Sequence, residues 1–148
     1  MKRTIFIPTD FSEASLGLVA HTLLLAGDDE IEIVLTHCFF LTDSIVELLF
    51  FDKDELFKSL KTRQFNTAFR ALRKKYSQVK VVFRWEIFTG FTQAAFRNFV
   101  SGNRITEAII PQPYFQLTHA IGNFDPTPYV RRSRLPVAVV SHYAYLMA

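Results

Sequence analysis

The sequence predicts an α/β protein built on a mainly parallel β-sheet. Short apolar runs rich in β-branched residues recur along the chain. Between them lie segments whose apolar side chains repeat at the spacing of one helical face. This alternation predicts βαβ units, in which each helix joins two parallel strands. The chain has 148 residues and no internal repeat or linker, so we expect a single domain over 1–148.

The first βαβ unit is predicted from the N-terminal third of the chain. Residues 4–8 (TIFIP) indicate a strand, and residues 9–12 supply the capping types that precede a helix. The apolar positions of that helix are Leu16, Val19, Leu23 and Ala26. Gly27 then favours a helix end, and residues 31–38 (IEIVLTHC) indicate the second strand.

A long helix is predicted next, over 52–76, after a loop rich in Phe and Leu. Acidic residues at its start and basic residues at its end match the helix macrodipole. The acidic residues are Asp52, Asp54 and Glu55, and the basic ones are Arg73, Lys74 and Lys75. The predicted buried stripe consists of Phe65, Phe69, Leu72 and Tyr76.

The third strand, predicted over 79–88, is expected at an edge of the sheet. Charged residues interrupt one of its faces, and a strand covered on both faces would not carry them. Gly90 and Thr92 introduce a helix that extends to about Val100. The last two strands are predicted at 105–110 (ITEAII) and 136–141 (PVAVVS).

Composition and charge narrow the class of protein. The net charge of +3 is modest and the basic groups are short, so nucleic-acid binding is not expected. The single Cys38 excludes an internal disulfide and favours a reducing compartment. Neither a signal peptide nor a membrane span is expected. A cytoplasmic location is therefore predicted.

The order of four motifs resembles the universal stress protein domain. They are the opening TIFIPTDFSEAS, the helix end LLLAG, the strand IEIVLTHC and the closing LPVAVVSH. Gly90 also lies where that family often has a glycine. The resemblance covers nearly the whole chain and implies a five-stranded parallel sheet of order 3-2-1-4-5 with flanking helices, a Rossmann-like arrangement. In such a sheet ligands bind where the strand order reverses, at the carboxyl ends of strands one and four.

Nucleotide-binding members carry a glycine motif after strand four, which this chain lacks. There, glycines let backbone N–H groups approach phosphate oxygens. Here Pro111 and Pro113 remove donors, and Tyr114 and Phe115 add bulk. Gly122 is the one glycine left in the segment. Pro126 and Pro128 allow only a late, shortened fourth helix. We therefore predict that the loop fills the crevice and that the nucleotide site is degenerate.

Two groups of residues are candidates for ligand binding at this crevice. They are Thr9, Asp10 and Phe11 after strand one, and His119, Gly122 and Asn123 in the loop after strand four. Asp10 matches the acidic position that reaches the ribose and adenine in nucleotide-binding relatives. Its alternative role is to cap the first helix or brace the turn, and Ser12 competes for the cap.

Catalytic and metal sites are not expected. The sequence has no G-x-S-x-G elbow and no H-x-x-x-H spacing. His37 and Cys38 are adjacent on a strand, so their side chains point to opposite faces. We predict neither an enzyme nor a metal site.

The fifth strand favours a homodimer. It occupies an edge in the implied order but carries no charge, and a bare apolar edge should be paired or covered. The predicted interface consists of Val137, Ala138, Val139, Val140, Ser141 and Tyr143. Universal stress domains that this chain resembles pair through their last strand. The alternative is that the C-terminal tail folds back over the edge.

The sequence thus predicts a homodimeric regulatory or interaction module without a cofactor, for which a protein partner is conceivable. The alternative is a sensor that binds ATP or AMP through Asp10 and an altered loop.

Overall fold

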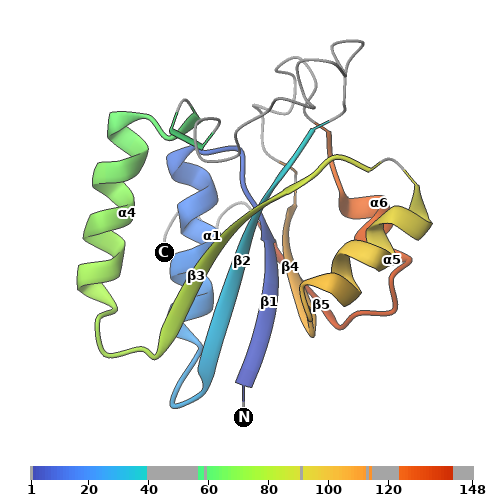
Figure 1. Ribbon diagram of the computed structural model, residues 1–148. Helices are drawn as coiled ribbons and strands as arrows, with labels where there is room; N and C mark the ends of the chain where they lie inside the picture. The colour runs from blue at the N-terminus through green and yellow to red at the C-terminus, as the bar shows by residue number, and fades with distance from the viewer. Residues whose placement is uncertain are drawn as a thin grey trace.

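The computed structural model describes residues 2–39, 57–58, 60–90, 92–112, 114 and 124–141. In chain order its elements are β1 (Lys2–Pro8), α1 (Glu13–Leu24), β2 (Glu30–Cys38), α4 (Arg63–Lys75), β3 (Val81–Phe88), α5 (Gln93–Gly102), β4 (Glu107–Gln112), α6 (Thr127–Arg131) and β5 (Val137–Ser141). The five strands form one sheet in the order β3-β2-β1-β4-β5, and each neighbouring pair is parallel. The predicted fold and strand order are confirmed. Helices α1 and α4 cover one face of the sheet, and α5 and α6 cover the other (Figure 1).

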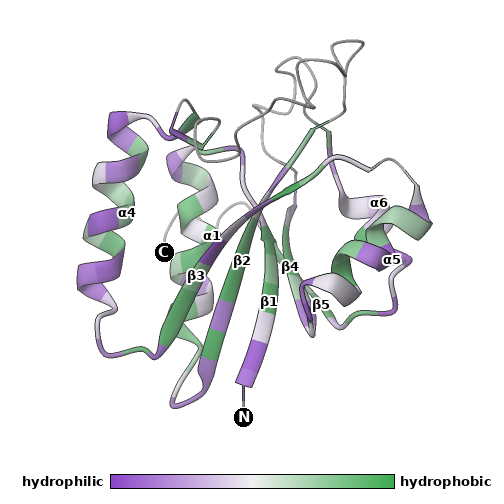
Figure 2. Cartoon of the chain, viewed as in Figure 1, coloured by the Kyte–Doolittle hydropathy of each residue, from purple (hydrophilic) through white to green (hydrophobic). Residues whose placement is uncertain are grey.

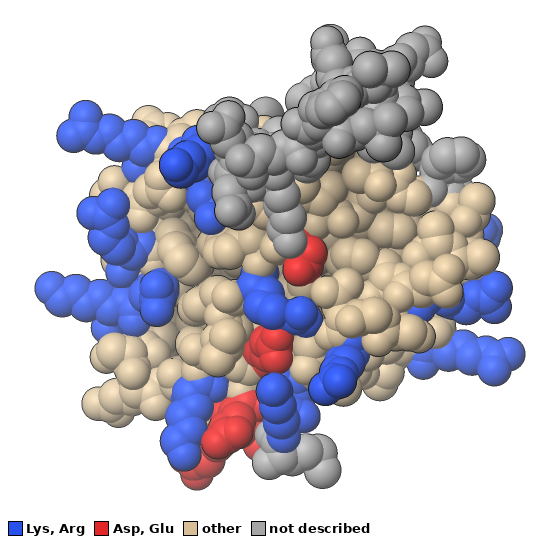
Figure 3. Space-filling model, viewed as in Figure 1, with Lys and Arg blue, Asp and Glu red and all other residues tan. Residues whose placement is uncertain are grey.

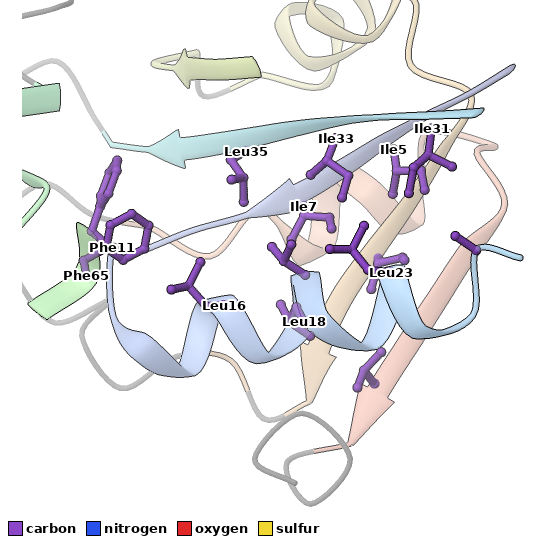
Figure 4. Close-up of a cluster of buried hydrophobic side chains, with 14 of the residues drawn as sticks. Ile5, Ile7, Phe11, Leu16, Leu18, Leu23, Ile31, Ile33, Leu35 and Phe65 are labelled. Carbon is purple, nitrogen blue, oxygen red and sulfur yellow. The ribbon is translucent and has the colours of Figure 1, made fainter. Parts of the chain in front are cut away.

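A hydrophobic core lies on each face of the sheet. Because the central strands are covered on both sides, they consist mainly of apolar residues, and hydrophilic ones lie towards the N-terminal ends of β1 and β2 (Figure 2). On β1, Ile5 and Ile7 face the helix α1, whereas Phe6 faces α5. Figure 4 shows Leu16, Leu18 and Leu23 of α1 lying against the isoleucines of β1 and β2. The sheet therefore separates two cores.

Strand β3 lies at one edge, as its charges predicted. Its apolar face, Val81, Phe83, Trp85 and Ile87, packs on the α1/α4 core. On the other face, Arg84 forms an ion pair with Glu32 of β2 and donates to the carbonyl of Asn103 at 2.9 Å. Val82 is 61% exposed on that face. The position of β3 is confirmed.

The prediction of one continuous helix over 52–76 was wrong in one respect: residues 57, 58 and 60 are helical, but the helix is interrupted at Lys61 and Thr62. Helix α4 begins at Arg63, because Thr62 adopts extended backbone angles and its hydroxyl accepts a hydrogen bond from the N–H of Phe65 at 3.1 Å. The acidic residues expected at the helix start lie outside the described residues. The basic end is confirmed, since Arg73, Lys74 and Lys75 form the last turn.

Strand β4 ends two residues later than predicted. It includes Pro111, which was expected in the loop but pairs in register with Val140 of β5 and is buried. The shortened last helix is confirmed: α6 has five residues and begins beside Pro126. Within the described part of the chain, none of the helices is both long and apolar enough to cross a membrane.

Candidate functional site

The candidate site lies where the strand order reverses, at the carboxyl ends of β1 and β4. These strands pair through Ile5 with Glu107 and Phe6 with Ala108, near the start of β4. In parallel sheets of this kind, ligands bind in the crevice outside the carboxyl ends of the strands at such a point. The described residues at this end come from the turn after β1, the end of β2, Tyr114 and the segment that begins at Phe124.

Thr9 holds the turn that follows β1. Its N–H donates to the carbonyl of Thr36 at 2.9 Å, which ties the turn to β2. Its hydroxyl oxygen accepts from the N–H of Phe11 at 3.0 Å and lies 3.0 Å from the hydroxyl of Ser15. Thr9 is 3% exposed. Its polar atoms are thus used in positioning the start of α1.

Asp10 braces the same turn, and Ser12 caps the helix. Oδ1 of Asp10 accepts from the N–H of Ser12 at 2.9 Å and also contacts the Ser12 hydroxyl. The Ser12 hydroxyl in turn accepts from the N–H of Ser15 at 3.2 Å, the bond typical of an N-cap. Of the two roles left open by the sequence, Ser12 takes the cap and Asp10 the bracing.

Phe11 points away from the crevice into the core. Its φ of 62° lies in the left-handed region, which turns the ring inward. The ring stacks on Trp85 with centroids 6.0 Å apart and meets the edge of Phe65 at 5.4 Å. The side chain of Phe11 is among the core residues in Figure 4. At 6% exposure, its ring offers no surface to a ligand, contrary to its selection as a candidate ligand residue.

His37 is a buried polar residue at this end of β2 that sequence reasoning did not place in the site. Its Nδ1 lies 3.3 Å from the carbonyl oxygen of Thr9, and because that oxygen only accepts, Nδ1 carries the proton. Burial lowers the pKa of His37 below its usual value, although the Thr9 carbonyl and the charge of Asp10 act in the opposite direction. The neutral ring packs against Phe11 at 5.3 Å.

Tyr114 lies two residues after the end of β4 and is half-buried. It packs against the core that lies on the α1 face of the sheet. Burial raises the pKa of its phenol well above the usual value, and the nearby Cys38, Asp125 and Asp10 act in the same direction. The side chain that follows β4 is thus packed against the protein's own core.

The segment that begins at Phe124 closes the same end of the sheet. The N–H of Phe124 donates to the carbonyl of Cys38 at 3.2 Å, so this segment is tied to the end of β2. The ring of Phe124 packs against Phe88 at 6.0 Å in the other core. The remaining candidates, His119, Gly122 and Asn123, lie outside the described residues, as do Pro113 and Phe115.

Strand β5 presents its edge as predicted, but its residues differ in exposure. Val139 is 41% exposed, and Ala138 and Ser141 are also exposed. Val140 is 4% exposed within the protein's own core, so only its backbone is available to a second chain. Tyr143 lies outside the described residues. Within the described ranges, no group of three or more His, Cys, Asp or Glu could hold a metal ion.

No protein-family model and no curated protein matches this sequence. Solved structures do resemble the fold. Universal stress protein UspA from Lactobacillus plantarum superimposes with a TM-score of 0.54 at 15% identity, over 94% of this chain and 96% of its own. A universal stress protein family member from Burkholderia pseudomallei gives 0.52 at 13% identity, over 93% and 94%. Hypothetical protein PH0823 gives 0.52 at 16% identity, over 94% of each chain. The chain thus has the universal stress protein fold that its motifs predicted.

Proposed function

We propose that this chain, which has the universal stress protein fold, is a homodimeric regulatory or interaction module that does not bind ATP through a glycine loop. The observation that carries the proposal is that Tyr114, two residues after β4, packs against the protein's own core on the α1 face. A triphosphate bound by backbone amides needs glycine-lined space after this strand. An aromatic residue here and a proline within the end of β4 argue against such a loop.

The turn after β1 supports the same proposal. In it, the hydroxyl of Thr9 and Oδ1 of Asp10 are engaged in hydrogen bonds that organise the start of α1. The ring of Phe11 is committed to the core. The structural roles of these three residues are sufficient to account for them without a bound ligand. We therefore propose a protein that acts by presenting a surface, without a cofactor and without turning over a substrate.

One observation favours the alternative, a sensor for adenine nucleotides. The two hydrogen bonds that Asp10 makes to Ser12 both use Oδ1, and the residue is half-buried at the crevice. In this alternative, the other carboxylate oxygen, Oδ2, would accept from a ribose hydroxyl. Binding of this kind would use the sugar and base and would depend less on the phosphates.

Calorimetric titration with ATP, AMP and adenosine separates the two functions. We expect no saturable binding at micromolar concentrations of any of the three. The matched variant is Asp10→Asn, which removes the charge but keeps an oxygen that can accept from Ser12, so α1 stays capped. Micromolar binding of ATP by the wild type, lost in Asp10→Asn, would overturn the proposal in favour of the sensor.

A further inference from the structure

Positive charge is concentrated in one stretch of the chain. Residues 57–80, which include α4, contain eight Lys or Arg and no Asp or Glu, although the whole chain has 17 basic and 14 acidic residues. The rest of the chain is therefore net negative, and the modest net charge of +3 conceals this asymmetry. Figure 3 shows Lys and Arg side chains projecting along the side formed by α4, while the Asp and Glu side chains in this view lie nearer the middle.

Three of these cations surround a hollow of about 420 Å³ at the C-terminal end of α4. They are Arg70, Arg73 and Lys74, and all three are exposed. Within the described part of the chain, no ion pair joins any of them to a carboxylate. The volume is within the range of roughly 300–1,000 Å³ that is typical of small-molecule sites.

The hollow is lined by apolar side chains as well as by these cations. Leu23 comes from the end of α1, Val79 from the turn after α4, and Val81 and Phe83 from β3. The guanidinium of Arg73 also lies 5.8 Å from the ring centroid of Phe83 and 5.9 Å from that of Phe69, within the range of a cation–π contact. Three elements thus combine an apolar lining with a group of unpaired positive charges.

We infer that this hollow, which we call the α4 hollow, binds a small amphipathic anion: one phosphate or carboxylate head joined to an apolar chain. The guanidinium groups of Arg70 and Arg73 present paired N–H donors that match the oxygens of such a head, and Lys74 adds a third charge. The apolar chain would cover the half-buried Val79 and Val81 and remove their exposed surface from water.

The same features argue against two simpler ligands. Inorganic phosphate would satisfy the cations but leave the apolar lining in contact with water. An uncharged alkyl chain would cover the lining but leave the head position unfilled. Only a ligand with both an anionic head and an apolar chain matches the cations and the apolar lining together. The α4 hollow lies on the helix side of β3 and is independent of the crevice at Asp10.

Calorimetric titration with dodecyl phosphate, kept below its micelle concentration, tests this inference. We expect saturable binding to one site, at least tenfold tighter than that of inorganic phosphate or of dodecanol. The triple variant Arg70→Gln, Arg73→Gln, Lys74→Gln should weaken binding at least tenfold. The matched control is Arg131→Gln, Arg132→Gln, Arg134→Gln, which removes the same charge beside α6 on the opposite face of the sheet and should leave binding unchanged.

A second pair of variants keeps all the charges. Ser77 lines the hollow, whereas the neighbouring exposed Gln78 does not. Ser77→Trp should therefore block binding, and Gln78→Trp should not. Thermal unfolding of each variant checks that the fold is retained.

Three outcomes would overturn the inference. They are no saturable binding of dodecyl phosphate, equal weakening by the two triple variants, and equal affinity for inorganic phosphate. If the first outcome were accompanied by binding to phosphatidylglycerol vesicles, this face would be assigned to a membrane surface instead.

Discussion

Three adjacent residues at the end of β1 have separate roles in the turn. Thr9 and Asp10 use side-chain oxygens to hold the backbone of Phe11 and Ser12, while Phe11 crosses into the core. Because Phe11 has a φ of 62°, the backbone bears a conformational cost that its buried ring offsets. The turn is thus organised around burying an aromatic ring below the crevice.

Substitution of Phe11 separates the stability gained by burying its ring from the conformational cost of its positive φ. Phe11→Ala should lower the free energy of unfolding by about 3–5 kcal/mol, as expected for removing a buried aromatic ring. Phe11→Gly should cost no more than Phe11→Ala, because glycine adopts a positive φ without strain. Urea unfolding followed by circular dichroism measures both. A glycine variant clearly less stable than the alanine variant would contradict the role of the left-handed conformation.

His37 gives the protein a predicted sensitivity to acid. Burial lowers its pKa in the folded state, so the unfolded chain binds the proton more readily. The stability that His37 contributes is therefore present above its unfolded pKa of about 6.5 and is lost as the pH falls towards the folded pKa.

Unfolding measurements between pH 7 and pH 5 test the direction of this change in stability. The free energy of unfolding should fall with a slope of up to about 1.4 kcal/mol per pH unit from this one group. His37→Gln should flatten the slope, whereas His21→Gln, on the surface of α1, retains His37 and should keep it. An unchanged slope in His37→Gln would mean that folding does not lower the pKa of this ring.

At the scale of elements, hydroxyl caps decide where helices begin. Ser12, Thr62 and Thr92 each have extended backbone angles, and each accepts from the N–H three residues later. Two of these caps follow strands and were visible in the sequence. Thr62 lies inside a segment whose helical pattern reads as continuous, so the start of α4 could not be found from periodicity alone.

The order of the strands was predicted partly from the residues and partly from the resemblance to the universal stress protein domain. The charges of β3 indicated an edge, and motif order supplied the rest of the topology. The candidate site was harder to predict. The position of Phe11 directly after the first strand suggested that it faces a ligand, but the direction of its side chain depends on a positive φ. The burial of His37 depends on contacts between separate elements.

The connection between β3 and α5 depends on a glycine. A Cβ added to Gly90 would lie 2.5 Å from Cβ of Ala95 and 3.0 Å from Cε1 of Phe88. Gly90→Ala should therefore destabilise the protein by about 1–3 kcal/mol through overpacking. Gly102→Ala is the matched control, since it has open space at the last position of α5, and should be neutral or stabilising by up to about 1 kcal/mol. Thermal unfolding that ranks the two variants in the opposite order would contradict this packing.

At the scale of the whole molecule, the sheet ends in two unlike edges. The β3 edge carries the charged residues Arg84 and Glu86 and lies beside the basic helix α4. The β5 strand is uncharged and forms the opposite edge of the sheet (Figure 1). Charges on an edge strand oppose pairing between chains, whereas a bare edge permits it. The asymmetry favours one mode of self-association, through β5.

Matched lysine substitutions at the two edges test this mode. Val139 on β5 is 41% exposed and Val82 on β3 is 61% exposed, so both positions accept a lysine without loss of core packing. Light scattering coupled to gel filtration should give the wild type twice the mass of the 17.1 kDa chain. Val139→Lys places like charges opposite one another across a twofold axis and should yield the monomer, whereas Val82→Lys should remain dimeric. A wild type that stays monomeric at every concentration, or a dimer lost only in Val82→Lys, would exclude association through β5.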